Sequence, residues 1–97
     1  MQVNRDSIIH FLRQQKPYLE KEFGVTAIAL FGSYARGEET PTSDIDIAIE
    51  LKKIDFEKRY ELKEFLEKQF NRTVDVGYLH TIRPFIRKRI EAELIYA

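Results

Sequence analysis

The sequence predicts a small α/β (α+β) fold, in which helices flank a mixed β-sheet of three to four strands. Segments with strand-like patterns alternate along the chain with segments whose apolar residues recur at helical spacing. A length of 97 residues, 43% of them hydrophobic, suits one domain over residues 1–97 with a single modest core. No internal repeat and no linker divides the chain.

The first helix is predicted to begin at Asp6 or Ser7, because either side chain can cap a helix. An apolar stripe follows at helical spacing. Pro17 lacks an N–H and fits poorly inside a helix. We therefore predict a break near Lys16 and a second helical piece that ends at about Glu22.

The first strand is predicted over residues 25–32, after Gly24 has ended the helix. It is almost continuously apolar and β-branched, as strands covered on both faces are. A helical turn over residues 33–36 and an exposed loop that contains Gly37 and Pro41 should follow it.

The second strand is predicted over residues 44–51, where apolar and other residues alternate. One face carries Ile45, Ile47, Ile49 and Leu51. The other carries Asp44, Asp46, Ala48 and Glu50. Two aspartates therefore stand side by side on a strand whose opposite face is built for a core.

The second half of the chain predicts a helix, a strand, a helix and an edge strand. Asp55 can cap the first of these helices. Its core-facing residues are expected to be Phe56, Tyr60, Phe65, Leu66 and Phe70. A third strand over residues 72–79 turns Asp75 away from its apolar residues. Thr81 can cap a last helix that carries Ile82, Phe85, Ile86 and Ile90, and residues 93–97 can form an edge strand.

Asp44, Asp46 and Asp75 are the candidate metal ligands. The first two lie two residues apart on one strand, so their Cα atoms should be roughly 6–7 Å apart on the same face. Asp75 joins them if the third strand lies beside the second. Carboxylate oxygens suit a hard divalent cation, above all Mg²⁺, which often completes its shell with substrate phosphates.

Gly32, Ser33 and Arg36 are the candidate phosphate-binding residues. Gly32 lets a ligand approach the backbone, Ser33 adds a hydroxyl donor, and Arg36 lies one helical turn further on. A phosphate site beside a carboxylate site makes nucleotidyl transfer chemically reasonable.

Composition excludes several other classes of protein. There are no cysteines, which rules out disulfides and cysteine metal sites. Sixteen basic and sixteen acidic residues give a net charge of zero, so direct nucleic-acid binding has no global electrostatic support. No signal peptide and no membrane-spanning run is evident, and the expected location is the cytoplasm.

The string LFGSYARGEETPTSDIDIAI resembles the GS-x10-DxD signature of the DNA polymerase β-like nucleotidyltransferase superfamily, and it is most similar to the minimal nucleotidyltransferase (MNT) domains. The resemblance implies that Gly32 and Ser33 bind a triphosphate, that Asp44 and Asp46 hold metal ions, and that Asp75 completes the catalytic site. It also implies transfer of AMP from Mg·ATP to a hydroxyl group, with release of pyrophosphate.

MNT proteins are typically encoded with a HEPN toxin, so the resemblance implies that this chain is the antitoxin of a toxin–antitoxin module. It would add AMP to a toxin hydroxyl, expected to be that of a tyrosine. The alternative is a catalytically idle antitoxin that neutralises the HEPN partner by binding alone. A homodimer and a hetero-oligomer with the toxin both stay open.

Other interpretations of single residues also stay open. Asp44 and Asp46 can be a solvated pair that binds nothing. Asp75 can pair with Arg72 or with an arginine of the last helix, and Arg36 can be an ordinary exposed residue.

Overall fold

The computed structural model describes residues 2–82 and 92–97, and within them four strands form one mixed sheet in the order β3-β2-β1-β4. The elements run α1 (Arg5–Phe23), β1 (Val25–Phe31), α2 (Gly32–Arg36), β2 (Ile45–Leu51), α3 (Phe56–Phe70), β3 (Val74–Tyr78), α4 (Leu79–Ile82) and β4 (Ile95–Tyr96). β1 pairs antiparallel with β2 and with β4, and β2 pairs parallel with β3. The predicted mixed sheet with flanking helices is confirmed, including the edge strand near the C-terminus.

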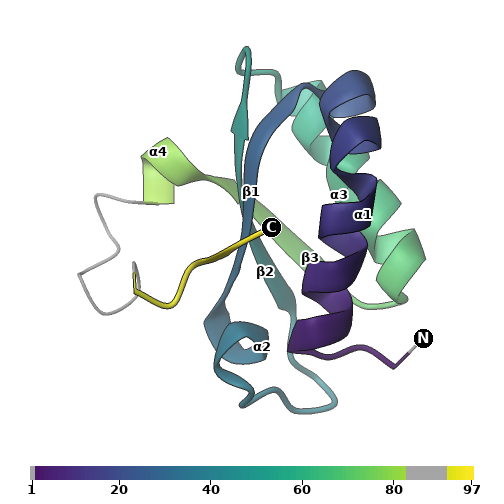
Figure 1. Cartoon of the computed structure of the whole chain (residues 1–97), viewed down its shortest axis with the longest axis vertical. Coiled ribbons are helices and arrows are strands. Elements are labelled where there is room, and N and C mark those ends of the chain that lie inside the picture. Colours follow the sequence, from purple (N-terminus) through teal and green to yellow (C-terminus); the bar gives the residue numbers. More distant parts are fainter. Residues whose placement is uncertain (1, 83–91) are drawn as a thin grey trace.

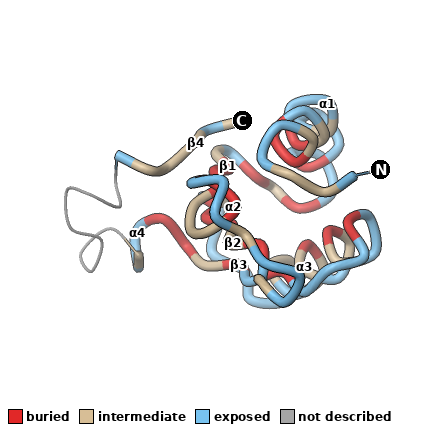
Figure 2. The backbone as a smooth tube through the Cα atoms, turned by 90° about the horizontal axis from the view of Figure 1, so that it is seen from below, coloured by how far each residue is buried: buried red, intermediate tan, exposed pale blue. Residues whose placement is uncertain are grey.

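Two long helices, α1 and α3, pack against the same face of the sheet (Figure 1). The buried residues of the sheet and of these helices face one another across this layer (Figure 2). The core includes the alternate residues of β2 predicted to face inward, namely Ile45, Ile47 and Ile49, each fully buried. α4 and residues 92–94, which precede β4, lie on the other side of the sheet from α1 and α3.

α1 is one continuous helix, so the predicted break near Lys16 is wrong. Pro17 lies inside the helix with an exposed side chain. Leu12 before it and Leu19 after it are both fully buried, and this burial outweighs the hydrogen bond that the proline ring removes. Tertiary packing therefore overrides the local preference for a break.

The cap of α1 also differs from the prediction. Asn4 is the N-cap, and its side-chain oxygen accepts a hydrogen bond from the Ser7 backbone N–H, while Ser7 Oγ accepts one from the Asn4 N–H. Asp6 and Ser7 therefore lie in the first turn of the helix, one and two residues after Arg5. At the other end, Gly24 adopts a left-handed conformation and ends the helix as predicted.

Replacing Pro17 with alanine should raise the free energy of unfolding by about 1–2 kcal/mol, because the restored N–H can donate within α1. The gain stays below the full intrinsic cost of an interior proline, since alanine also makes the unfolded chain more flexible. Urea denaturation measures the change. Gln14→Ala, at another exposed position of α1, is the control and should change stability little. A destabilised Pro17→Ala variant would show that the packing of α1 requires the proline.

α3 is capped by Asp55 as predicted, but its core face is narrower than expected. Leu62, Leu66 and Phe70 are buried, at spacings of four residues. Phe56 and Tyr60 were predicted to face the core and instead expose 69% and 59% of their surface. They fall in the first turns of the helix, before the stretch that supplies its buried residues.

The end of the chain is described only in part. Thr81 lies inside α4 rather than at its start, so it is not the predicted cap. Phe85, Ile86 and Ile90 of the predicted last helix lie outside the described residues. A side chain on Gly77 would collide with Ile82, which places α4 directly over the middle of β3.

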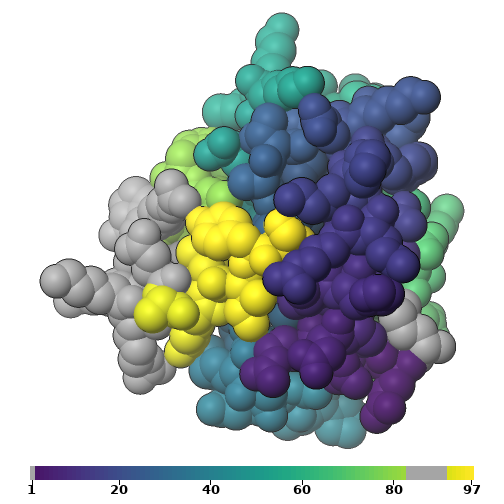
Figure 3. Space-filling view, in the orientation of Figure 1, coloured from purple at the N-terminus to yellow at the C-terminus, as the bar shows by residue number. Residues whose placement is uncertain are grey.

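β4 closes the edge of the sheet beside β1, where the backbone N–H of Ala97 donates to the Ile28 carbonyl. In the space-filling view this C-terminal segment lies on the surface next to α1 (Figure 3). The described helices include none that has both the length and the apolar character needed to cross a bilayer.

Candidate active site

The three candidate metal ligands lie at one end of β2 and β3. β2 begins at Ile45, so Asp44 immediately precedes it, and Asp46 is its second residue. In the parallel pairing of β2 with β3, Asp46 lies directly opposite Asp75. Because neighbouring strands are about 4.8 Å apart and paired residues project to the same side, both carboxylates lie on the face opposite the core. The predicted neighbour relation of the second and third strands is confirmed.

The Gly-Ser turn lies on the other side of Asp46. Phe31, the last residue of β1, pairs with Asp46 in the antiparallel register. The chain then turns at Gly32, whose backbone φ is +75°, and enters the short helix α2. A methyl group at Gly32 would overlap the Asp46 carboxylate oxygen Oδ2, so the backbone of the turn and the carboxylate are in close contact. The sheet therefore orders the site as turn, Asp46, Asp75.

Burial and neighbouring negative charges both disfavour the ionised form of Asp46. The pKa of Asp46 is raised from 3.8 to about 6, first by burial and then by the negative charges of Asp75 and Asp44. The positive charge of Arg36 opposes the rise. A divalent cation would stabilise the ionised form of all three acids, because it supplies the opposite charge that the cluster lacks.

The carboxylates of the site fit a Mg²⁺ ion whose remaining ligands come from the substrate and from water. Within the described parts of the chain, no group of three or more His, Cys, Asp or Glu side chains is arranged to hold a metal by itself. Mg²⁺ is commonly bound through one or two carboxylates together with substrate phosphates and water. Asp44 and Asp46 supply such carboxylates, and the backbone of the Gly32 turn lies against the Asp46 carboxylate.

Arg36 is exposed, but it has two acidic neighbours. Its Nε donates to Glu38 Oε2 at 3.4 Å, and its Nη1 donates to Glu93 Oε2 at 3.1 Å. The pKa of Arg36 is raised, chiefly by the hydrogen bond to Glu93. Arg36 is thus held at the edge of the site, and its charge reaches Asp46.

Glu93 is a residue of the site region that the sequence did not reveal. Its side chain is only 18% exposed, and it reaches Arg36 from a position 57 residues further along the chain. No local pattern marks it, because the contact exists only after β4 has paired with β1.

Asp75 is exposed, and among the residues that the structure describes it makes no ion pair. Arg72, one of its predicted alternative partners, donates instead to the backbone carbonyl of Asn71. The arginines of the predicted last helix lie outside the described residues. Among the described residues Asp75 is thus not paired with Arg72, and its charge acts on the neighbouring Asp46.

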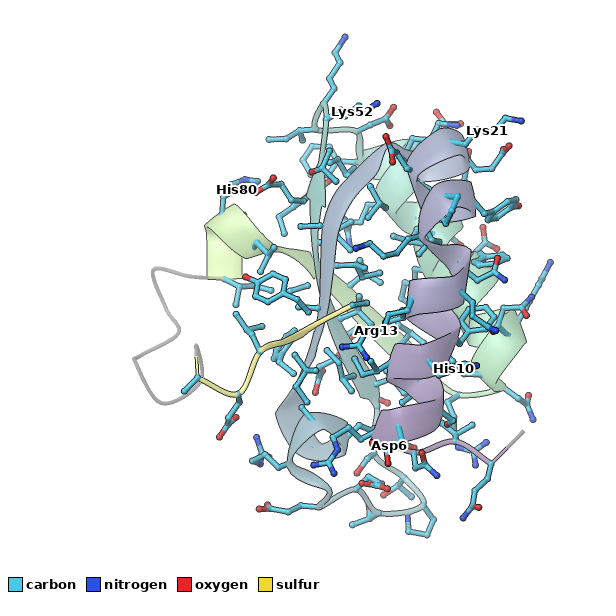
Figure 4. All side chains as sticks on the ribbon, viewed as in Figure 1. Asp6, His10, Arg13, Lys21, Lys52 and His80 are labelled. Carbon is cyan, nitrogen blue, oxygen red and sulfur yellow. The ribbon has the colours of Figure 1, made fainter. Side chains whose placement is uncertain are left out.

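Other residues of types that often carry chemistry lie in the core or at the surface. Tyr34 is 3% exposed and belongs to the core. His10 and His80 are both exposed and lie far apart, on α1 and α4 (Figure 4). Ser33 lies in the first turn of α2, which receives no side-chain cap from Phe31.

Comparison with known proteins identifies the family of the chain. A family model described as a nucleotidyltransferase domain matches residues 12–97. A Methanocaldococcus jannaschii protein named as a protein adenylyltransferase is 44% identical over 93 residues, which span 92% of this chain and 93% of the relative.

Two solved structures are similar as well. A minimal nucleotidyltransferase superposes with a TM-score of 0.76 at 24% identity, covering 96% of this chain and 95% of that one, and thus shows the same fold. A toxin–antitoxin structure with AMP-PNP superposes with a TM-score of 0.57 at 34% identity, covering 80% of this chain and 59% of that one. The chain belongs to the nucleotidyltransferase domain family.

Proposed function

We propose that this protein is a Mg²⁺-dependent protein adenylyltransferase, which transfers AMP from ATP to a hydroxyl group, expected to be that of a tyrosine, on a partner HEPN toxin. The observation that carries the proposal is the register of the sheet, which sets Asp46 between Asp75 and the Gly32 turn. The adenylyltransferase relative and the toxin–antitoxin structure with an ATP analogue support the same chemistry. The chain would act as the antitoxin in the cytoplasm, where ATP and the toxin meet.

Each site residue then has a defined task. The backbone of Gly32 and the hydroxyl of Ser33 receive the triphosphate at the turn. Asp44 and Asp46 would hold Mg²⁺, which when bound would neutralise phosphate charge and lower the pKa of the attacking hydroxyl. Arg36 ends the short helix that begins at Gly32, its charge acts on Asp46, and it can donate to a phosphate oxygen.

The transfer step exchanges one phosphorus–oxygen bond for another. The acceptor hydroxyl oxygen forms a bond to the α-phosphorus of ATP, and the bond from that phosphorus to the bridging oxygen of pyrophosphate breaks. The pyrophosphate carries away the electron pair of the broken bond. Asp75 is exposed beside Asp46 and is placed to accept the hydroxyl proton.

The proposal is tested by incubating the purified protein and its HEPN partner with Mg·ATP and measuring the intact mass of the partner. The partner should gain whole AMP units and lose its RNase activity. The double variant Asp44→Ala with Asp46→Ala should add no AMP and leave the RNase active, because both Mg²⁺ ligands are gone. Neutralisation by the double variant that equals the wild type would instead show an antitoxin that acts by binding alone.

A further inference from the structure

A groove of about 520 Å³ opens directly beside the carboxylate cluster. One wall is the loop before β2, and the other is the connection between α3 and β3. Its lining residues are Pro41, Thr42, Ser43, Asp44, Glu67, Asn71, Arg72 and Thr73. Asp44 belongs both to this groove and to the predicted metal ligands, so the groove leads into the candidate active site.

The two walls are joined at the start of the parallel strand pair. The backbone N–H of Ile45 donates to the Thr73 carbonyl at 2.9 Å. Ile45 directly follows Asp44, and Thr73 lies two residues before Asp75. Glu67 Oε2 accepts hydrogen bonds from the Val74 N–H and from Lys63 Nζ, which fixes the α3 side. The two connections that line the groove are therefore tied to each other where β2 and β3 begin.

The geometry of in-line attack indicates which of the two substrates, ATP or the acceptor protein, lies on the side of the groove. In phosphoryl transfer the attacking and leaving oxygens lie roughly in line on opposite sides of the phosphorus. The Gly32 turn contacts Asp46 from the β1 side, while Asp75 and Thr73 lie on the β3 side. A triphosphate at the Gly32 turn places the leaving pyrophosphate toward β1, so the acceptor must arrive from the side of β3 and the groove.

The chemistry of the groove favours a polypeptide. The described residues that line it include no aromatic side chain, so it offers no stacking surface for a base. Hydroxyl groups of Thr42 and Thr73 can hydrogen-bond to peptide groups. Arg72 is exposed, and its Nη1 donates to the Asn71 carbonyl. Its guanidinium has five N–H donors in all, and it can pair with a carboxylate.

We propose that this groove binds the segment of the acceptor protein that carries the modified hydroxyl, with Arg72 recognising an acidic side chain of that segment. The inference rests on the proposed adenylyltransferase function and adds to it the side from which the acceptor protein approaches. Arg72 is a specificity residue here, since it lies at the groove rather than at the reacting atoms.

Two variants test the groove from its two walls. Arg72→Glu reverses the charge that recognises the acceptor, and Thr42→Trp fills the space. In AMP transfer from Mg·ATP, each variant should raise the KM for the HEPN partner about tenfold. A change of this size is expected when a charge-assisted hydrogen bond is lost, as in Arg72→Glu, or when a bulky side chain blocks part of the contact surface, as in Thr42→Trp. The affinity for Mg²⁺ with α,β-methylene ATP, which cannot lose pyrophosphate, should stay as in the wild type.

Matched controls separate recognition from folding and from net charge. Lys53→Glu makes the same charge reversal just after the other end of β2, and Gln14→Trp places the same bulky side chain on the exposed face of α1, away from the groove. Both should keep the wild-type KM within about twofold. Thermal unfolding of all four variants checks that they are folded.

An unchanged KM in both Arg72→Glu and Thr42→Trp would overturn the groove assignment while leaving the adenylyltransferase intact. Loss of affinity for the ATP analogue in these variants would also overturn it, because the groove would then hold the nucleotide. Failure of the wild type to transfer AMP would instead overturn the proposed function, and the groove assignment with it.

Discussion

Asparagine in place of Asp46 should abolish AMP transfer and at the same time stabilise the metal-free protein at neutral pH. The loss of transfer, at least a hundredfold, follows from removing a carboxylate that holds Mg²⁺ in the proposed mechanism. The gain in stability follows from the raised pKa, because an ionised Asp46 that is partly buried and lies next to Asp75 and Asp44 is unfavourable in the folded protein.

The pH dependence of this gain has a definite sign. The pKa of Asp46 is about 6 in the folded protein and near 3.8 for an unperturbed aspartate. Between these values the folded state binds more protons than the unfolded state, so the wild type loses stability as pH rises through this window. The full penalty applies above pH 6. Because Asp46 is only half-buried, we expect a penalty of about 1–2 kcal/mol after allowing for solvent screening.

Urea denaturation of both proteins from pH 4 to pH 8 without Mg²⁺ measures this difference. The Asp46→Asn variant should be the more stable one above pH 6, and the difference should vanish near pH 4. Glu50→Gln, an acid on the same face of β2 but at its other end, is the control and should show neither effect. Retained AMP transfer in Asp46→Asn would contradict the catalytic role, and equal stability at all pH values would contradict the charge repulsion.

Gly32→Ala should destabilise the fold by about 2–3 kcal/mol and weaken binding of Mg·ATP at least tenfold. Two causes add. A side chain is strained at the positive φ of residue 32, and its methyl group would overlap the Asp46 carboxylate. The carboxylate or the turn must move, and either movement alters the place where the triphosphate is expected to bind.

Gly37→Ala is a matched control for this variant. Gly37 has nearly the same backbone φ, +71° against +75°, but a Cβ there would meet nothing within 4 Å. It should lose only the strain contribution, about 1 kcal/mol, and keep its affinity for the nucleotide. Chemical denaturation and calorimetric titration with Mg²⁺ and α,β-methylene ATP measure both quantities. Equal effects of the two substitutions would show that contact with Asp46 is unimportant.

The sequence by itself determined the strands, the helical turn after Gly32 and the pair Asp44 and Asp46. These features are local. Alternation of apolar residues sets which face of β2 is buried, and the fixed spacing between the Gly-Ser turn and the aspartates can be seen without knowledge of the fold. The same local reasoning failed at Pro17, because the burial of Leu12 before it and of Leu19 after it outweighs the preference of proline for a helix break.

Only the tertiary structure decided how distant residues meet. The parallel register sets Asp75 opposite Asp46, although nearly thirty residues separate them, and strand order alone could not have chosen this register. The contact of Glu93 with Arg36 depends on the pairing of β4, and the groove at Thr42 and Arg72 depends on the closure of β2 against β3. Such contacts arise from packing of the whole chain, and no short stretch of sequence encodes them.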